Sequence, residues 1–210
     1  MGDIDEVAAG FFKTFQDTYI SLALREVNKE LSRRDSLRGQ GRFKWFTPEE
    51  AAVAEALAMI IVPTDEESVG IEDIDVLGPP AIEVLDNVVS ECSERRHAYS
   101  RGLLSFDLWS SKEHGCKFAE LAKADQIMLF ESSQRAYEEW KASGPRILKA
   151  WRRIRSIFRA SSGRFFAAQL YPQIRHDCFR VFYTSRVSWI WLEYDGPPME
   201  EGYPQLAARR

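Results

Sequence analysis

Apolar residues recur every three or four positions along the first 31 residues, at 4, 8, 11, 15, 19 and 22 and then at 20, 24, 27 and 31. This spacing is typical of an amphipathic helix, whose apolar face drifts slowly around the helix axis. The sequence therefore predicts one long helix over 4–31, followed by a polar, glycine-containing linker over 32–42. We expect this arm either to dock on its own domain or to embrace another subunit. Phe11 and Phe15 on its apolar face are candidate partner-binding residues.

The strongest helix-start signal in the chain is Thr-Pro-Glu-Glu at residues 47–50. The hydroxyl of Thr47 can accept from the third backbone N–H of a helix, and Glu50 can reach back to the N–H of Thr47. The proline lies where a helix has no use for its missing N–H, and both carboxylates favour the positive end of the helix dipole. A helix is therefore predicted from Thr47 to about Val62, because Pro63 disfavours helical backbone in the residue before it.

After residue 63 the chain is first acidic, over 64–75, and then regains a helical spacing of apolar residues after 79–80. Residues 64–75 hold six carboxylates and no base, without the ligand spacing of a calcium-binding loop, so we expect a solvated loop. A helix is predicted to open after the two prolines at 79–80 and to continue through Cys92 to Phe106, because its apolar residues keep a helical spacing. Two further helical segments are predicted at 112–121 and 125–140.

The C-terminal part is predicted to hold a helix over 165–183 and one extended segment over 187–194, which is rich in tryptophan and β-branched residues. No alternation of apolar and polar residues flanked by hairpin turns occurs anywhere in the chain, so the predicted fold class is all-α. We expect an irregular helical domain over 43–210 with an extended aromatic C-terminal tail. The N-terminal helical arm and its linker, 1–42, precede that domain.

The formal net charge of −4 conceals a segregation of charge along the chain. Residues 141–176 carry nine Lys or Arg and no carboxylate, which gives +9 and leaves −13 for the other residues. Within this stretch, 145–159 has the pattern of a basic amphipathic helix, with Trp151 on its apolar face and Arg152 and Arg155 among the arginines on the rest. Such a helix suits contact with a protein, an anionic membrane surface or phosphates. The acidic remainder repels polyanions and no nucleic-acid motif is present, so we favour a protein partner, with the membrane surface as the alternative.

Aromatic residues are also abundant in the C-terminal tail, among them Trp189, Trp191 and Tyr194. Arginine and aromatic side chains are enriched at the centres of protein interfaces. We therefore expect these three residues to bind a partner chain, together with those of the arm and the basic helix. The alternative is that the tail folds back and caps the core of its own domain.

The residues of a catalytic centre are not evident in the sequence. The glycine-rich nucleotide-binding motifs, the H-E-x-x-H zinc motif and the G-x-S-x-G nucleophile motif are all missing. An H-x-C spacing does occur twice, at His114 and Cys116 and at His176 and Cys178, and four such ligands could hold zinc. However, His114 lies in a polar run and Cys178 among apolar residues, which predicts surface and core respectively. We expect no catalytic, cofactor-binding or metal-binding residues in this chain.

Two features bear on where the protein resides. No apolar run approaches the roughly 20 residues that span a bilayer, so we expect no transmembrane segment. Ser32-Arg33-Arg34 resembles a twin-arginine export motif, but a glycine-containing polar stretch follows where the apolar region of a signal should be. We interpret the motif as a charged hinge and expect a cytoplasmic protein. The alternative is a periplasmic location beside an exported partner.

Two blocks of sequence resemble a known family. Residues 46–66, Phe-Thr-Pro-Glu-Glu-Ala-Ala through Val-Pro-Thr-Asp-Glu, are similar to the opening of the gluconate 2-dehydrogenase subunit 3 family. Residues 182–204, with Phe-Tyr, a tryptophan, Tyr-Asp-Gly-Pro-Pro and Gly-Tyr-Pro, are similar to its C-terminal block. The resemblance covers about 43–204, and it is loose between 107 and 164.

This resemblance implies a small, non-catalytic subunit that binds, stabilises or assists maturation of a large flavoprotein of the glucose-methanol-choline type. In such complexes the large subunit holds FAD, oxidises gluconate, glucose or a glycoside, and often passes electrons to a cytochrome c subunit. Members typically carry a twin-arginine signal, whereas here residues 1–31 precede the motif and its apolar region is missing. Two rival hypotheses are a peripheral membrane or protein-docking adaptor that uses 145–159, and an autonomous enzyme built on His114, His176 and the cysteines.

Overall fold

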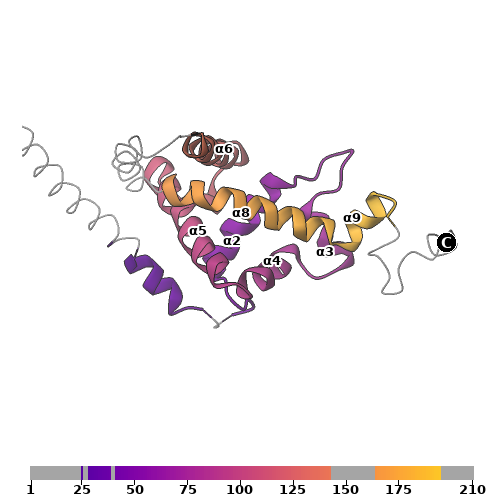
Figure 1. Cartoon of the computed structure of the whole chain (residues 1–210), viewed down its shortest axis with the longest axis horizontal. Coiled ribbons are helices and arrows are strands. Elements are labelled where there is room, and N and C mark those ends of the chain that lie inside the picture. Colours follow the sequence, from indigo (N-terminus) through magenta and orange to yellow (C-terminus); the bar gives the residue numbers. More distant parts are fainter. Residues whose placement is uncertain (1–24, 26–27, 39–40, 143–163, 195–210) are drawn as a thin grey trace, which may run out of the picture.

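Helix α8 (Arg164–Tyr183) runs through the centre of the fold, and α5 (Ser93–His114) and α6 (Lys123–Lys141) make its largest contacts (Figure 1). The computed structural model describes residues 25, 28–38, 41–142 and 164–194. Throughout these residues the chain forms helices, turns and loops without a strand, which confirms the all-α prediction. The remaining elements are α2 (Pro48–Ile61), the 3₁₀ helix η1 (Ile71–Asp73), α3 (Ile74–Leu77), α4 (Ala81–Ser90), the 3₁₀ helix η2 (Phe118–Glu120) and α9 (Arg186–Trp191).

Helix α2 begins and ends where the sequence predicts. The Oγ1 of Thr47 accepts from the N–H of Glu50 at 3.2 Å, and Oε2 of Glu50 accepts from the N–H of Thr47 at 3.1 Å. Pro48 occupies the first turn and Val62 forms the C-cap. All the signals involved lie within one turn of each end, so local sequence fixes both bounds.

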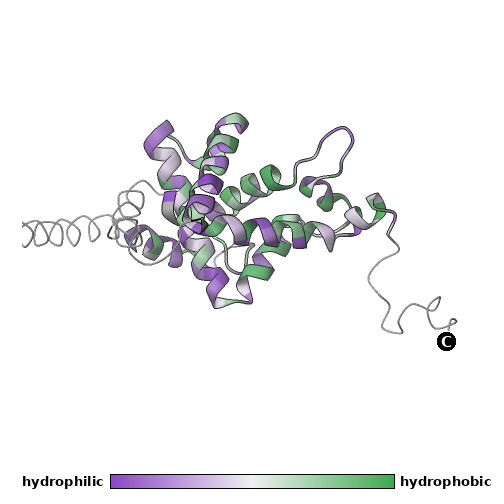
Figure 2. Ribbon diagram, turned by 45° about the horizontal axis from the view of Figure 1, so that its top comes forward, coloured by the Kyte–Doolittle hydropathy of each residue, from purple (hydrophilic) through white to green (hydrophobic). Residues whose placement is uncertain are grey.

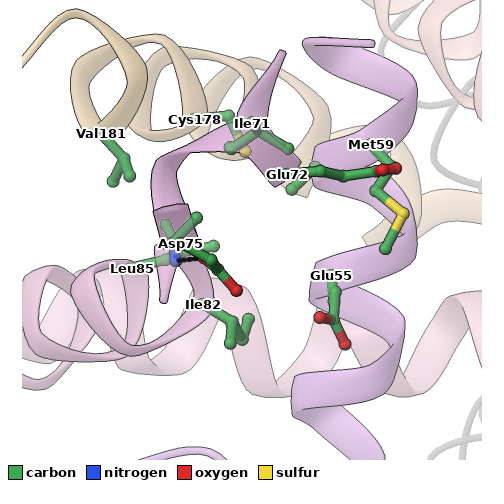
Figure 3. A pocket seen from close by; sticks show the side chains of 11 residues that line it. Glu55, Met59, Ile71, Glu72, Asp75, Ile82, Leu85, Cys178 and Val181 are labelled. Carbon is green, nitrogen blue, oxygen red and sulfur yellow. Dashed lines mark hydrogen bonds between the residues drawn. The ribbon is translucent and has the colours of Figure 1, made fainter. Parts of the chain in front are cut away.

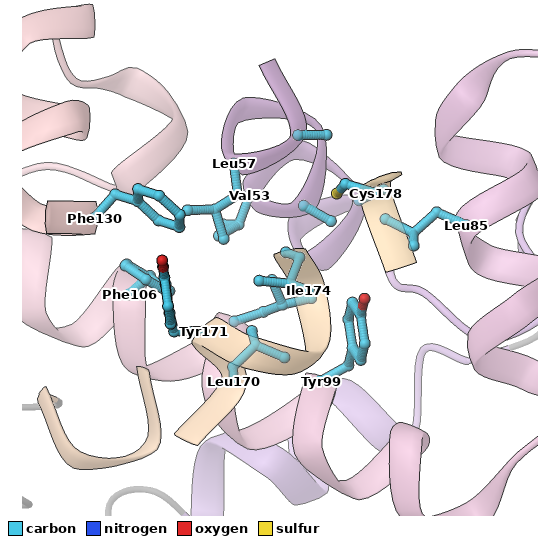
Figure 4. Packing of buried hydrophobic residues seen from close by; sticks show 14 of the residues in the cluster. Val53, Leu57, Leu85, Tyr99, Phe106, Phe130, Leu170, Tyr171, Ile174 and Cys178 are labelled. Carbon is cyan, nitrogen blue, oxygen red and sulfur yellow. The ribbon is translucent and has the colours of Figure 1, made fainter. Parts of the chain in front are cut away.

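The core lies where α8 crosses α5 and α2 (Figure 4). Leu170 and Ile174 of α8 are fully buried, as are Leu103 and Phe106 of α5. The two helices approach most closely at Gly102, where an added Cβ would lie 2.5 Å from the Cβ of Leu170. Real Cβ contacts are never so short, so glycine at 102 is what allows α5 and α8 to pack at this distance.

Asp86 of α4 ties the segment before α2 to the domain. The carboxylate is 2% exposed and accepts from three consecutive backbone N–H groups, those of Lys44 at 2.6 Å, Trp45 at 3.0 Å and Phe46 at 2.7 Å. One carboxylate thus satisfies three backbone donors at once. The start of α2 is thereby held against α4.

The single helix predicted from residue 79 through Cys92 to Phe106 is wrong, because the chain breaks into α4 and α5 at Glu91 and Cys92. Cys92 has extended backbone, with φ −128° and ψ 124°, and stands at the N-cap of α5. The break lets α4 pack against both α5 and α8. Apolar residues keep their helical spacing across it, so the periodicity alone gives no sign of the break.

The helical segment predicted at 112–121 is also wrong. Helix α5 continues to His114 and ends at Gly115, whose φ of 79° lies in the left-handed region that favours glycine. The short η2 then turns the chain into α6 (Lys123–Lys141), which confirms the helix predicted at 125–140. Gly115 is therefore the signal in the sequence that ends α5, and the prediction of a helix across it did not take this glycine into account.

The extended segment predicted at 187–194 is wrong for most of its length, because residues 186–191 form α9. The Oγ of Ser185 accepts from the N–H of Ser188 at 3.2 Å and caps this helix. Val187, Trp189 and Ile190 suit a strand by composition, but the described residues offer no strand for them to pair with. A local serine cap therefore outweighs β-propensity here.

Candidate docking surface

Helix α3 lies against α9 at one end of the described part of the fold (Figure 1), where the ribbon coloured by hydropathy includes hydrophobic residues (Figure 2). Large apolar residues of both helices are exposed there. Val76 of α3 is 76% exposed and Ile190 of α9 is 60% exposed. We call this end the α3–α9 surface, and its exposed large apolar residues are Val76, Leu77, Tyr183, Ile190, Trp191, Leu192 and Tyr194. Elsewhere in the described part of the chain, large exposed apolar side chains are scattered at Leu37, Met128 and Trp140. A gathering of this kind marks a binding surface more often than a neutral one.

The loop before α3 is closed by Asp73. Its Oδ2 accepts from Oγ1 of Thr64 at 3.0 Å and from the N–H of Gly70 at 2.8 Å. Gly70 lies so close to Thr64 that an added Cβ would meet its Oγ1 at 2.3 Å. The N–H of Ile71 donates to the carbonyl of Val62 at 3.0 Å. These contacts fix the four-residue α3 with Ile74 buried, which leaves the next apolar pair of α3 outside the core.

The aromatic residues of the tail divide into two roles. The indole N–H of Trp189 donates to the carbonyl of Tyr183 at 2.7 Å, and its ring meets that of Tyr194 edge-on at 6.3 Å. The ring of Trp191 lies 6.4 Å from that of Phe182 while 43% of the residue is exposed. Trp189 therefore holds α9 to the end of α8, whereas Trp191 and Tyr194 are 43% and 42% exposed.

The other predicted partner-binding residues, Phe11, Phe15, Trp151, Arg152 and Arg155, lie outside the described residues. Sequence reasoning missed the α3 half of the surface. Val76 and Leu77 directly follow the acidic stretch 64–75, which the sequence predicts to be a solvated loop and not a binding surface. The one available signal was an adjacent apolar pair ahead of two prolines.

A cavity of about 220 Å³ opens beside this surface, between α2, η1, α3, α4 and α8 (Figure 3). Three of its lining residues are carboxylates, Glu55, Glu72 and Asp75. The other lining residues are Ala58, Met59, Ile71, Ala81, Ile82, Leu85, Cys178 and Val181. Burial, and then the charge of Asp177, raises the pKa of the Cys178 thiol. A thiol with a raised pKa stays protonated, so Cys178 lacks the thiolate that nucleophilic or metal-binding chemistry requires.

The arginines of the motif at 32–34 are part of the fold. Arg34 is 2% exposed, and its Nη2 donates to Oδ2 of Asp107 on α5 at 2.7 Å. The same nitrogen lies 3.6 Å from Oε2 of Glu49 on α2. The second oxygen of Asp107 accepts from the N–H of Phe118 at 3.2 Å. Arg34 thus connects the N-terminal segment to α2 and α5 at once.

Arg38 makes a second connection to the start of α2. Its guanidinium donates to both oxygens of Glu50, at 2.7 and 2.9 Å, and to Oγ of Ser100 at 2.6 Å. The guanidinium also lies 4.0 Å from the ring centre of Trp45. Residues 28–35 are helical, so the helix does not end at residue 31 and the stretch interpreted as a charged hinge is instead docked on the domain.

No group of three or more His, Cys, Asp or Glu side chains within the described residues could hold a metal ion. In the same part of the chain, each helix is too short or too polar to cross a bilayer.

Comparison with known proteins gives one match. Residues 48–196, more than half of the chain, match the family described as gluconate 2-dehydrogenase subunit 3. No curated protein and no solved structure matches. The matched region begins at Pro48, the first residue of α2, and it includes the cavity and the whole of the α3–α9 surface. The chain therefore belongs to the gluconate 2-dehydrogenase subunit 3 family, whose name describes an accessory subunit of a dehydrogenase complex.

Proposed function

We propose that this chain is a non-catalytic small subunit that binds and stabilises, or helps to mature, the large subunit of a sugar dehydrogenase. The large subunit is a flavoprotein of the glucose-methanol-choline type that holds FAD and oxidises gluconate, glucose or a glycoside. A cytochrome c subunit is a further proposed partner. The observation that carries the proposal, beside the family, is the α3–α9 surface, where large apolar side chains lie exposed.

The burial and pairing of reactive groups support a non-catalytic role. Asp177 is fully buried, and Oδ2 accepts from the hydroxyl of Tyr99 at 3.1 Å and the amide of Gln173 at 2.9 Å. Nη2 of Arg95 lies 3.3 Å from Oδ1. Burial and the charge of Asp177 raise the pKa of Tyr99 well above its ordinary value, so the phenol keeps its proton. The polar groups of Tyr99, Gln173, Arg95 and Asp177 therefore pair with one another inside the fold, as the members of a structural hydrogen-bond network do.

The composition of the α3–α9 surface supports a protein partner. Tryptophan and tyrosine are over-represented at the energetic centres of interfaces, where they contact apolar anchors of the partner. Trp191 and Tyr194 would supply such rings, and Val76, Leu77 and Ile190 would supply aliphatic contacts. Docking would remove from water the apolar area that the fold of this chain leaves exposed.

We further propose that the protein acts in the cytoplasm, with a periplasmic site beside an exported partner as the alternative. The support is the burial of Arg34 and its ion pair with Asp107. The buried guanidinium of Arg34 is not accessible to an export receptor in the folded chain. In the folded chain Arg34 is committed to the domain, so its role here is structural.

The test is co-expression of the full chain with a flavoprotein large subunit of the glucose-methanol-choline type from the same organism. The wild type should co-purify with the flavoprotein, and the double variant Val76→Ser/Ile190→Ser should bind about tenfold more weakly, because truncating an interface anchor commonly costs more than 1 kcal/mol. A matched control, Met128→Ser/Trp140→Ser, changes side chains on α6 that are 47% and 61% exposed and should bind like the wild type. If the wild type fails to co-purify and flavin loading is the same without it, the proposed function is wrong.

A further inference from the structure

The α3–α9 surface is bordered by carboxylates that form no ion pair with a base among the described residues. Glu55, Glu72 and Asp75 line the neighbouring cavity (Figure 3). Asp65, Glu66 and Glu67 lie on the loop that leads to it. None of these six forms an ion pair with any base in the described part of the chain. Negative charge therefore accumulates beside the exposed apolar side chains.

Carboxylates that contact the N-terminal segment are, by contrast, paired with bases. Glu49 pairs with Arg33 and Lys117, and Glu50 pairs with Arg38. Asp107 pairs with Arg34. Within the described residues, the acids that hold the N-terminal segment in place are paired with bases, whereas the six that border the α3–α9 surface are not. Like charges gathered on one surface repel one another, and a cationic partner relieves that repulsion.

The cavity fits the side chain of an arginine or a lysine. Such side chains lay their apolar stems on apolar surface while the charged head meets polar groups, and Met59, Ile82 and Val181 offer the apolar wall. The carboxylates of Glu55 and Glu72 stand in the same lining and can receive the head in charge-assisted hydrogen bonds. Arginine is also among the residues that dominate binding energy at interfaces.

We propose that the α3–α9 surface binds a face of its partner on which apolar side chains are accompanied by Arg or Lys, and that one of these cationic side chains enters the cavity between Glu55 and Glu72. The inference rests on the proposed function, because the partner is the flavoprotein subunit. It adds the chemistry by which that partner is recognised: the apolar contacts hold the complex together, and the charges set its orientation and its sensitivity to salt.

The test measures the affinity of the full chain for the purified flavoprotein as salt is raised from about 0.01 M to about 0.15 M, which shortens the Debye length from about 30 Å to about 8 Å. Wild-type binding should weaken with salt. The isosteric variant Glu55→Gln/Glu72→Gln should bind on the order of tenfold more weakly at low salt and should show a smaller salt dependence than the wild type, because four of the six carboxylates remain. Both side chains are exposed, so the variant should fold like the wild type. The matched control Glu131→Gln/Glu138→Gln changes two exposed carboxylates on α6 and should behave like the wild type.

Three outcomes would overturn the inference. If the complex forms but the Glu55/Glu72 variant binds as tightly as the wild type at every salt concentration, the cationic partner is wrong while the proposed function stands. If the isolated chain forms a salt-sensitive dimer that the same variant abolishes, the occupant is a second copy of this chain, whose residues 141–176 carry nine bases. If the wild type forms no complex with the flavoprotein, the proposed function and the inference fail together.

Discussion

Replacing Arg34 by methionine should lower the melting temperature of the full chain by about 10 °C. Removing one partner of a buried ion pair typically costs about 3–5 kcal/mol, and each kcal/mol shifts the melting temperature of a chain this size by about 2–4 °C. The side chains of Arg34 and Asp107 are only 2% and 6% exposed, so water cannot replace the lost guanidinium. The matched control is Arg33→Met, whose side chain is 45% exposed and should cost about 1 kcal/mol or less.

A neutral pair should restore much of that loss. Burial raises the pKa of Asp107 even though Arg34 and the N–H of Phe118 oppose it, which means that the fold holds this carboxylate ionised at a cost. In Arg34→Met/Asp107→Asn no charge stays buried, and the amide oxygen can still accept from Phe118. We expect the double variant to melt at a higher temperature than Arg34→Met alone.

The pH dependence has a definite sign. Because the pKa of Asp107 is raised in the folded state, its carboxyl takes up a proton at a higher pH in the folded chain than in the unfolded chain. The free-energy cost of burying the charged carboxylate is therefore present at high pH and is relieved as pH falls through the folded pKa. Without Arg34 this cost is larger, so the gap in melting temperature between Arg34→Met and the wild type should narrow in acid. A loss no greater than that of Arg33→Met, or a gap that widens in acid, would contradict the structural role assigned to the twin arginines.

Replacing Gly102 by alanine should destabilise the domain by about 1–3 kcal/mol, the usual cost of overpacking a core. An alanine Cβ would lie 2.5 Å from Cβ and 2.6 Å from Cδ2 of Leu170, so α5 and α8 would have to separate. Helix propensity alone predicts the opposite sign, because alanine is favoured over glycine inside a helix by about 1 kcal/mol. The direction of the change in denaturant midpoint therefore distinguishes tight packing from propensity.

The matched control for this substitution is Gly78→Ala. An added Cβ there would meet nothing closer than the carbonyl oxygen of Ile74 at 3.7 Å, and its φ is −160°, which is ordinary extended backbone. We expect Gly78→Ala to change the stability by less than about 0.5 kcal/mol. A Gly102→Ala variant as stable as the wild type would show that α5 and α8 are not packed as closely as described.

Features that depend on a few neighbouring residues could be predicted from the sequence. Helix α2 is the clearest case, since Thr47 and Glu50 cap each other within a single turn. The helical class of the chain followed from apolar spacing, which needs no tertiary information. The prediction of an extended segment at 187–194 was wrong because two local signals conflict there, and the serine cap at Ser185 outweighs the β-branched composition.

The surface and the arginine contacts depend on tertiary structure and could not be predicted in the same way. Arg34 and Asp107 lie 73 positions apart, so no local pattern reports that they meet. Val76 and Trp191 are brought to one end of the fold only because α3 packs against α9. In each case the decisive neighbour is distant in sequence, whereas composition and periodicity describe only near neighbours.

We have proposed that the chain docks on a dehydrogenase subunit through the α3–α9 surface. Amide hydrogen exchange of the full chain, alone and in the co-purified complex, tests this directly because it reports protection segment by segment. We predict slower exchange on binding at residues 74–77 and 186–194, with little change along α6. Unchanged exchange at α3 and α9, with protection confined to α6, would contradict the account.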